Sequence, residues 1–260
     1  MDILNILQNQ LGLYLLVLTR ISGIFIISPF LGSTNIPAVI RTSAAVAISL
    51  VLFPIIEVKT GTAIPESLIG YIIVLCSELF IGWIIGFIAS LTFSAIRMAG
   101  QILDMQVGFA MVNVLDPTTG QQIPLIGSFK YNLAIIIFLV TNSHHLLLTG
   151  LFDSFRLIPI LSNPFSISIT KLVVDMVAAT FTIAIKISLP VLVAIVLTDV
   201  ALGVLARTMP QMNIFIVGIP AKIFVGLFIL AFALPFYILF LDVAFNEMYG
   251  NIYVILRAMG

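Results

Sequence analysis

The sequence predicts an all-α membrane protein. Of its 260 residues, 61% are hydrophobic and 8% are charged, whereas about 25% of the residues are charged in an average soluble domain. Several apolar runs are long enough for helices that cross a hydrocarbon layer about 30 Å thick, which takes about 20 residues. The longest stretches of mixed composition, residues 100–127 and 151–171, are too short to hide a soluble domain. We therefore expect residues 1–260 to form a single membrane-embedded domain.

Charge and cysteine content exclude several kinds of protein. The 11 basic and 11 acidic residues cancel and are spread singly along the chain, so nothing resembles the basic patch of a nucleic-acid-binding protein. Cys76 is the only cysteine, which excludes an intrachain disulfide and a metal site made of thiolates. No basic residue precedes Arg20, so we expect the first apolar run to be retained and not cleaved as a signal peptide.

The first two apolar runs are expected to form a hairpin of helices. The run from Ile3 to Ser28 stops at Pro29, which lacks the N–H that would continue a helix. Residues 29–37 are rich in turn-forming types. The run from Ala38 to Phe53 then stops at Pro54.

The third apolar run, from Ser67 to Met98, is longer than one membrane crossing requires. A helix of about 30 residues would reach about 45 Å, against about 30 Å of hydrocarbon. Along it, small residues and one carboxylate recur at every fourth position, which places them on one side of the helix. They are Glu78, Gly82, Gly86, Ser90 and Ser94. Such a ridge permits close helix packing, either within this chain or against a neighbouring subunit.

The stretch from Gly100 to Gly127 is polar and rich in glycine, although it lies between apolar runs. Non-helical backbone in hydrocarbon leaves N–H and C=O groups unpaired at several kcal/mol each, so such a segment lies outside the bilayer, inside protein or along a wet cavity. We interpret it as a pore or gate loop. The alternative is an ordinary loop on the membrane surface.

Three further apolar runs complete the chain, from Tyr131 to Phe152, from Ile169 to Arg207 and from Ile214 to Asp242. Residues 157–168 form a loop before the second of these, and Pro190 is expected to bend it. The tail from Asn246 to Gly260 has a mixed composition.

Single charges occur within the apolar runs. A charge near the middle of a membrane helix costs about 2.5–3.5 kcal/mol, so we expect Arg20 to have a partner in the same assembly. Asp175 and Lys186 cannot pair with each other on one straight helix, because eleven residues separate them by about 16 Å. Unpaired charges of this kind indicate either a functional site or contact with other subunits.

No motif for nucleotide binding or catalysis occurs in the chain. The patterns GxxxxGK[ST], GxGxxG, HExxH and GxSxG are absent, and the acidic residues stand singly instead of in acid–base pairs. The adjacent His144 and His145 would point about 100° apart on a helix, without a nearby Cys, Asp or Glu. We expect neither an enzyme nor a cofactor or metal site. The Lys and Arg pattern favours neither orientation in the membrane.

Three blocks of residues together resemble the FliR family. The first has Arg20, Gly23, Pro29, Pro37, Arg41 and Pro54; the second has Glu78, Gly82, Gly86, Ala99, Gly100, Asp104, Gln106, Gly108, Asp116 and Pro117; the third has Gly203, Arg207, Pro210, Gln211, Asn213, Phe215, Gly218, Pro220 and Lys222. The third block is the most specific, because fixed polar residues in an apolar background seldom coincide. The resemblance covers essentially the full length, although Asp199 stands where a glutamate is expected.

FliR is a subunit of the flagellar type III export gate, with SctT as its counterpart in virulence injectisomes. The resemblance implies that one copy of this chain joins several copies of FliP and FliQ in a helical, conical gate in the bacterial inner membrane, at the flagellar basal body. FlhB would wrap the cytoplasmic entrance, and unfolded flagellar proteins would be exported.

Within such a gate the long helices would pack as bent hairpins, with residues 1–156 similar to FliP and residues 157–260 similar to FliQ. The charged residues expected to contact other chains are Arg20, Asp175, Lys186, Asp199, Arg207 and Lys222.

The resemblance also implies that residues 106–122 form a plug that closes the channel. The expected plug residues are Gln106, Gly108, Phe109, Met111, Val112, Asn113, Val114, Leu115, Asp116, Pro117 and Gly120. Glycine permits the backbone to move, Asp-Pro favours a turn, and the apolar side chains can close a pore by excluding water.

Two other readings fit the same sequence. A secondary transporter would use helices broken by proline, with Glu78, Asp175, Lys186 and Asp199 as ion-coupling groups. A structural scaffold would differ from the gate only in whether the central stretch faces a conduit. An injectisome export-gate subunit is the close variant of the flagellar hypothesis.

Overall fold

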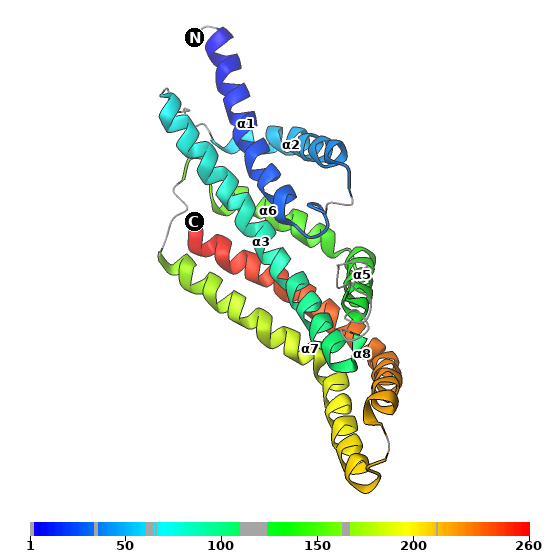
Figure 1. Ribbon diagram of the computed structural model, residues 1–260. Helices are drawn as coiled ribbons and strands as arrows, with labels where there is room; N and C mark the ends of the chain where they lie inside the picture. The colour runs from blue at the N-terminus through cyan, green and yellow to red at the C-terminus, as the bar shows by residue number, and fades with distance from the viewer. Residues whose placement is uncertain are drawn as a thin grey trace. The chain divides into compact units, whose positions relative to one another are not determined.

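The computed structural model describes residues 3–33, 36–60, 65, 67–109, 124–162, 167–211 and 213–260, in which all regular structure is helical. Figure 1 labels the helices, whose bounds are α1 (Ile3–Ile27), α2 (Ala38–Thr60), α3 (Leu68–Val107), α5 (Leu125–Val140), α6 (Ser143–Leu157), α7 (Ile167–Thr208) and α8 (Ile214–Met259). The predicted all-α class is confirmed for these residues.

Length and composition identify this as a membrane protein. Five described helices are long and apolar enough to span a bilayer, over residues 10–27, 38–56, 68–107, 169–208 and 216–259. The pair α5 and α6 would supply a sixth span, but the two helices are bent by 69° at their junction.

Two predicted breaks in the helices are wrong. Pro54 lies inside α2, which continues to Thr60, since one proline removes a single backbone hydrogen bond and leaves the others in place. Residues 100–107 are the last turns of α3 and not part of a loop. Conversely, the run from Tyr131 to Phe152 is interrupted at Asn142, whose φ of 57° is left-handed. Asparagine tolerates that conformation better than most residues.

The tail from Asn246 is helical to Met259, which its mixed composition did not indicate. Its buried side chains recur every three or four residues, at Met248, Ile252, Ile255 and Met259. This spacing marks one apolar face of a helix. The face packs on α6, where a Cβ on Gly150 would lie 3.1 Å from Ile252 Cγ2.

The chain forms two compact units that interleave along the sequence. Unit 1 contains Met1–Leu91, Asn142–Met176 and Asn246–Gly260, and unit 2 contains Thr92–Thr141 and Val177–Phe245. Helices α3, α7 and α8 therefore contribute to both units. The division at residue 156 into parts similar to FliP and FliQ concerns likeness to other subunits and stays a prediction.

In unit 1, α1 packs closely against α3 because glycines face each other where they cross. A Cβ on Gly23 would lie 2.7 Å from the carbonyl oxygen of Leu79, and one on Gly82 would overlap the carbonyl oxygen of Arg20. Gly86 faces Ile24 and Ser28 of the same chain. This part of the predicted ridge therefore packs within the chain. Farther along, Ser90 and Ser94 are partly buried.

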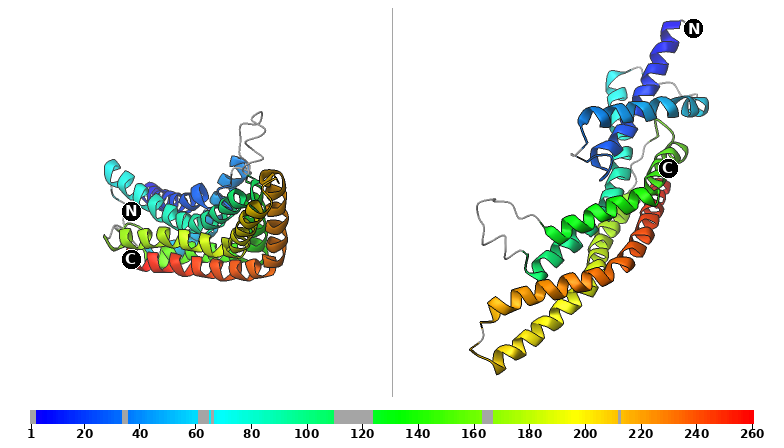
Figure 2. Two further views of the ribbon diagram at one scale, coloured as in Figure 1. Left: turned by 60° about the horizontal axis from the view of Figure 1, so that its bottom comes forward. Right: turned by 90° about the vertical axis from the view of Figure 1, so that its right-hand side faces the viewer.

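In unit 2, the second part of α7 and the first part of α8 run side by side as a hairpin, drawn in yellow and orange in Figures 1 and 2. The other end of α8 within this unit meets α3 and α5 in an aromatic cluster. Ring centroids of Phe93, Phe138 and Phe245 lie 5.1 to 5.6 Å apart, and such pairs stabilise beyond their buried area.

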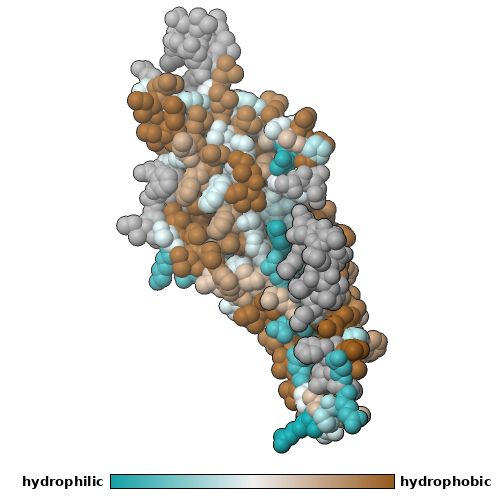
Figure 3. Space-filling view, viewed as in Figure 1, coloured by the Kyte–Doolittle hydropathy of each residue, from teal (hydrophilic) through white to brown (hydrophobic). Residues whose placement is uncertain are grey.

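Much of the described surface is apolar. In an 18-residue apolar window of each helix, only 17% of the residues of α7 and 11% of those of α8 are buried in this chain. Apolar side chains cover much of the face in Figure 3, whereas hydrophilic ones gather at its lower tip. A soluble monomer rarely exposes apolar patches of more than a few hundred Å², so these helices are suited to lipid or to other chains.

We predict that Gly82→Ala destabilises the protein by about 1–3 kcal/mol, because the new methyl group overlaps the backbone of Arg20 on α1. Trp83, the only tryptophan, lies in the same contact and reports thermal unfolding by fluorescence. Gly250→Ala is the matched control, since nothing lies within 4 Å of its added Cβ and alanine favours a helix by about 1 kcal/mol. Equal effects of the two substitutions would contradict the packing.

Candidate functional site

The candidate site is the base of the central stretch, where α3 ends and α5 begins. Of the predicted plug residues, the structure describes Gln106, Gly108 and Phe109; Gln106 is exposed, and Phe109 packs against the core. Gly108 has a φ of 101°, a conformation that L residues rarely adopt, and it ends the helix. The remaining plug predictions, Met111, Val112, Asn113, Val114, Leu115, Asp116, Pro117 and Gly120, lie outside the described residues.

Asp104 joins the two ends of this stretch. Its carboxylate, 5% exposed, accepts hydrogen bonds from the backbone N–H groups of Ile126 at 2.8 Å and Gly127 at 2.9 Å. The first N–H groups of a helix have no partner within it, and α5 has no side-chain cap of its own at Pro124. Asp104 therefore supplies the missing acceptor. Its negative charge also lies at the positive end of the α5 dipole.

Two glycines permit this arrangement. A Cβ on Gly100 would overlap the Cα of Gly127, so the backbones of α3 and α5 touch. Asp104 lies one turn farther along the same face of α3, within reach of the start of α5. In the sequence Gly100 and Asp104 stand out only as residues of the family motif, and their four-residue spacing is the pattern that places them on one face of α3.

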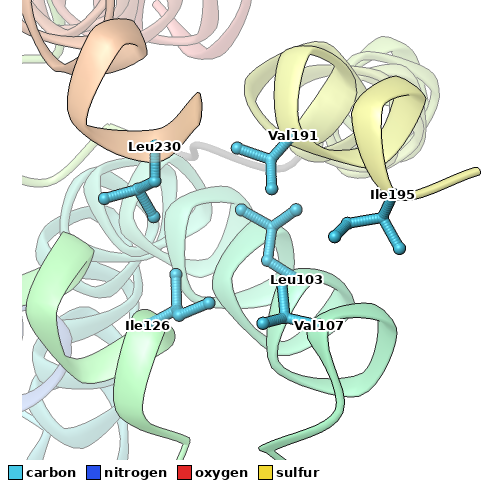
Figure 4. Close-up of a cluster of buried hydrophobic side chains, with 6 residues drawn as sticks. All are labelled: Leu103, Val107, Ile126, Val191, Ile195 and Leu230. Atoms are coloured by element: carbon cyan, nitrogen blue, oxygen red, sulfur yellow. The ribbon is translucent and has the colours of Figure 1, made fainter. Parts of the chain in front are cut away.

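A cluster of buried side chains holds both ends in place. Figure 4 shows that it draws on four helices, with Leu103 and Val107 from α3, Ile126 from α5, Val191 and Ile195 from α7, and Leu230 from α8. Phe109 packs against this cluster. The end of α3 at Val107 and the start of α5 at Leu125 are therefore both held by the same buried cluster.

A second polar site lies in unit 1, where Arg20 is fully buried. Its Nε donates to Glu78 Oε2 at 2.6 Å, and its Nη1 donates to the carbonyl oxygen of Ile158 at 3.0 Å. Its guanidinium lies 4.3 Å from the ring centroid of Phe155. The sequence prediction placed the partner of Arg20 in another chain, whereas the structure places it in this one. The partner is 58 residues away in sequence, so no local pattern indicates it.

The other charges predicted to contact other chains fall into two groups. Lys222 and Asp199 form an ion pair with each other, so the carboxylate of Asp199 reaches its cation within this chain. Asp175, Lys186 and Arg207 are exposed and form no ion pair among the described residues. Their assignment to contacts between chains stays a prediction.

Comparison with known proteins places these features in a family. A family model described as "Bacterial export proteins, family 1" matches residues 11–248. The chain is 37% identical over 230 residues to the flagellar biosynthetic protein FliR of Bacillus subtilis, covering 87% of this chain and 88% of that protein. It is 26% identical over 242 residues to the protein of the same name from Escherichia coli, covering 93% and 92%. It is also 29% identical over 224 residues to Yop proteins translocation protein T of Yersinia pestis, covering 85% of each.

We predict that Asp104→Ala frees the start of α5. Losing two hydrogen bonds to a charged acceptor should accelerate amide hydrogen exchange at Ile126 and Gly127 by about tenfold or more, measured by mass spectrometry. Asp104→Asn, which retains one acceptor oxygen, should be intermediate. Gln101→Ala on the exposed side of the same helix should leave exchange unchanged. Unaltered exchange in Asp104→Ala would disprove the cap.

We also predict that Glu78→Leu destabilises the protein by about 3–5 kcal/mol, because it leaves the guanidinium of Arg20 buried without its counterion. The double variant Arg20→Met with Glu78→Leu should recover most of the loss, since the remaining side chains are apolar and carry no charge. Thermal unfolding of the single and double variants measures the coupling. Additive effects would show that the two side chains act independently.

Proposed function

We propose a function from one established premise, which is that the chain belongs to the family described as Bacterial export proteins, family 1. In this proposal the chain is a non-enzymatic subunit of the flagellar type III export gate in the bacterial inner membrane, at the basal body. Through this gate unfolded flagellar proteins leave the cytoplasm. Support comes from similarity to flagellar biosynthetic proteins named FliR over most of both chains.

In this proposal the chain works within an assembly with FliP and FliQ subunits and with FlhB. The exposed apolar faces of α7 and α8 support it, because few residues in the apolar window of either helix are buried by the chain itself. Asp175 and Arg207 also support it, since each is a single exposed charge that forms no ion pair among the described residues. Neighbouring chains would cover much of these apolar faces and supply the counter-charges of Asp175 and Arg207.

In this proposal residues 106–122, the middle of the stretch from Gly100 to Gly127, form the plug of the channel. The observation that carries this proposal is the base formed by Asp104, Gly100 and Gly127, which joins α3, the helix before the segment, to the start of α5, the helix after it. A plug needs ends that stay fixed in the wall of a channel while its middle closes or clears the passage. Gly108, with its positive φ, lies at the boundary between the anchored helix and the plug.

We predict that deleting Gly108–Gln121 leaves the assembly intact but allows small ions to leak. Membrane conductance of vesicles that contain the purified assembly measures the leak, and copurification of the partner chains reports assembly. Replacing the same residues with a Gly-Ser segment of equal length is the matched control, which separates the apolar plug surface from mere chain length. Unchanged conductance in the deletion would count against the plug.

A scaffold without a conduit differs in one measurable respect. In the channel, a stalled export substrate passes the plug, so cysteines placed at Met111 or Val114 should crosslink to it. Repeated failure to capture substrate would favour the scaffold. The transporter hypothesis is less well supported, because Glu78 and Asp199 are both engaged in ion pairs with cations of this chain. Ligand-dependent stabilisation of the solitary chain would favour it.

A further inference from the structure

Unit 2 contains a buried lysine that the export function leaves unexplained. Lys130 of α5 is 4% exposed, and its ammonium lies 4.8 Å from the ring centroid of Tyr237 on α8. Among the described residues, its ammonium donates a single hydrogen bond, a long one of 3.4 Å to the carbonyl oxygen of Ile187. No carboxylate among the described residues forms an ion pair with it. A buried charge without a counterion is costly, so an anion is expected here.

Lys130 meets α7 in the turn that precedes Pro190, which lies inside the helix. Proline cannot donate to the carbonyl four residues before it and distorts the turn in which it lies. The carbonyl of Ile187 belongs to that turn, which is where Lys130 approaches. An ammonium group has three N–H donors, and this long hydrogen bond uses one of them.

A cavity of about 150 Å³ adjoins Lys130. On the same measure a single water needs about 10–15 Å³, so a group as large as phosphate fits. Lys186 of α7 also lines the cavity, and the rest of its wall is apolar apart from the hydroxyl of Tyr237, which donates to the carbonyl oxygen of Lys130 at 3.0 Å. Two cations thus face one cavity that contains no acidic side chain in its described wall.

An apolar track leads away from this cavity along α8. It begins at Phe236, which lines the cavity and is 74% exposed, and continues through Phe232, Phe228 and Phe224, all exposed. Rings 224, 228 and 232 follow each other with centroids 6.2 and 4.8 Å apart. Twelve helical residues span about 18 Å, close to one leaflet of a hydrocarbon core about 30 Å thick.

We propose that this cavity binds the phosphate of an anionic phospholipid, whose acyl chain lies along the phenylalanine track. Basic pockets between membrane helices recognise anionic headgroups, and the non-bridging oxygens of one phosphate accept hydrogen bonds from both lysines. A carboxylate from a protein would satisfy the cations without using the adjoining track of leaflet length, whereas one phospholipid accounts for both the cations and the track. Lys186 then has a lipid as its partner and not another chain. The site is independent of the export function.

Lipid retention on the full chain, purified with the chains that accompany it, tests the proposal. Native mass spectrometry compares the uptake of phosphatidylglycerol and of phosphatidylcholine with the same acyl chains. We expect phosphatidylglycerol to bind in preference, and Lys186→Gln, at an exposed position, to weaken it about tenfold. Lys130→Gln should remove the preference. Lys171→Gln, also exposed on α7, is the matched control and should bind as the unaltered chain does.

Two results would overturn the proposal. One is equal uptake of the two lipids by the unaltered chain. The other is a zero-length crosslink from Lys130 or Lys186 to a carboxylate, whether that of Asp116 or one in another chain, since the anion would then be protein. If Lys130→Gln fails to fold, the result for Lys186→Gln still decides.

Discussion

Unpaired backbone groups cost several kcal/mol in an apolar surrounding, and this constraint organises the described chain. The backbone N–H and C=O groups inside a helix pair with one another. The groups that need other partners therefore lie at helix ends and at interruptions. Four charged side chains serve such points. Asp104 accepts from the start of α5, and Arg20 donates to the carbonyl of Ile158 just after α6. Lys130 donates to the carbonyl of Ile187 in the turn before Pro190, and Arg41 donates to the carbonyl of Gly32 at 3.1 Å.

These charged side chains serve the backbone as well as one another. Each buried one replaces water that a soluble protein would use to solvate a helix end. Arg20 also carries its own counterion, Glu78, which lies on the glycine face that brings α1 and α3 together. Close packing and charge neutralisation therefore depend on the same few turns of α3.

The sequence was sufficient for the helices but not for the connections between them. Composition and run length predict long apolar helices, and the four-residue spacing of Gly82 and Gly86 predicts a close contact without naming the partner. The pairing of Arg20 with Glu78 depends on how two helices cross, which no local pattern contains. Pro54 was predicted to end a helix, but α2 continues through it because one lost hydrogen bond does not end a helix. The average composition of the tail did not indicate a helix, although the spacing of its apolar residues is that of one helical face.

The contact between Gly100 and Gly127 has a consequence for variation among relatives. When the two ends of a segment are already adjacent, lengthening the segment raises the entropic cost of closing it only slightly. The increase is about 0.6 kcal/mol for each doubling of its length. Insertions, deletions or wholesale exchange between residues 109 and 124 therefore leave the supporting helices undisturbed. The supporting helices can stay constant while the segment between them varies in sequence and in length.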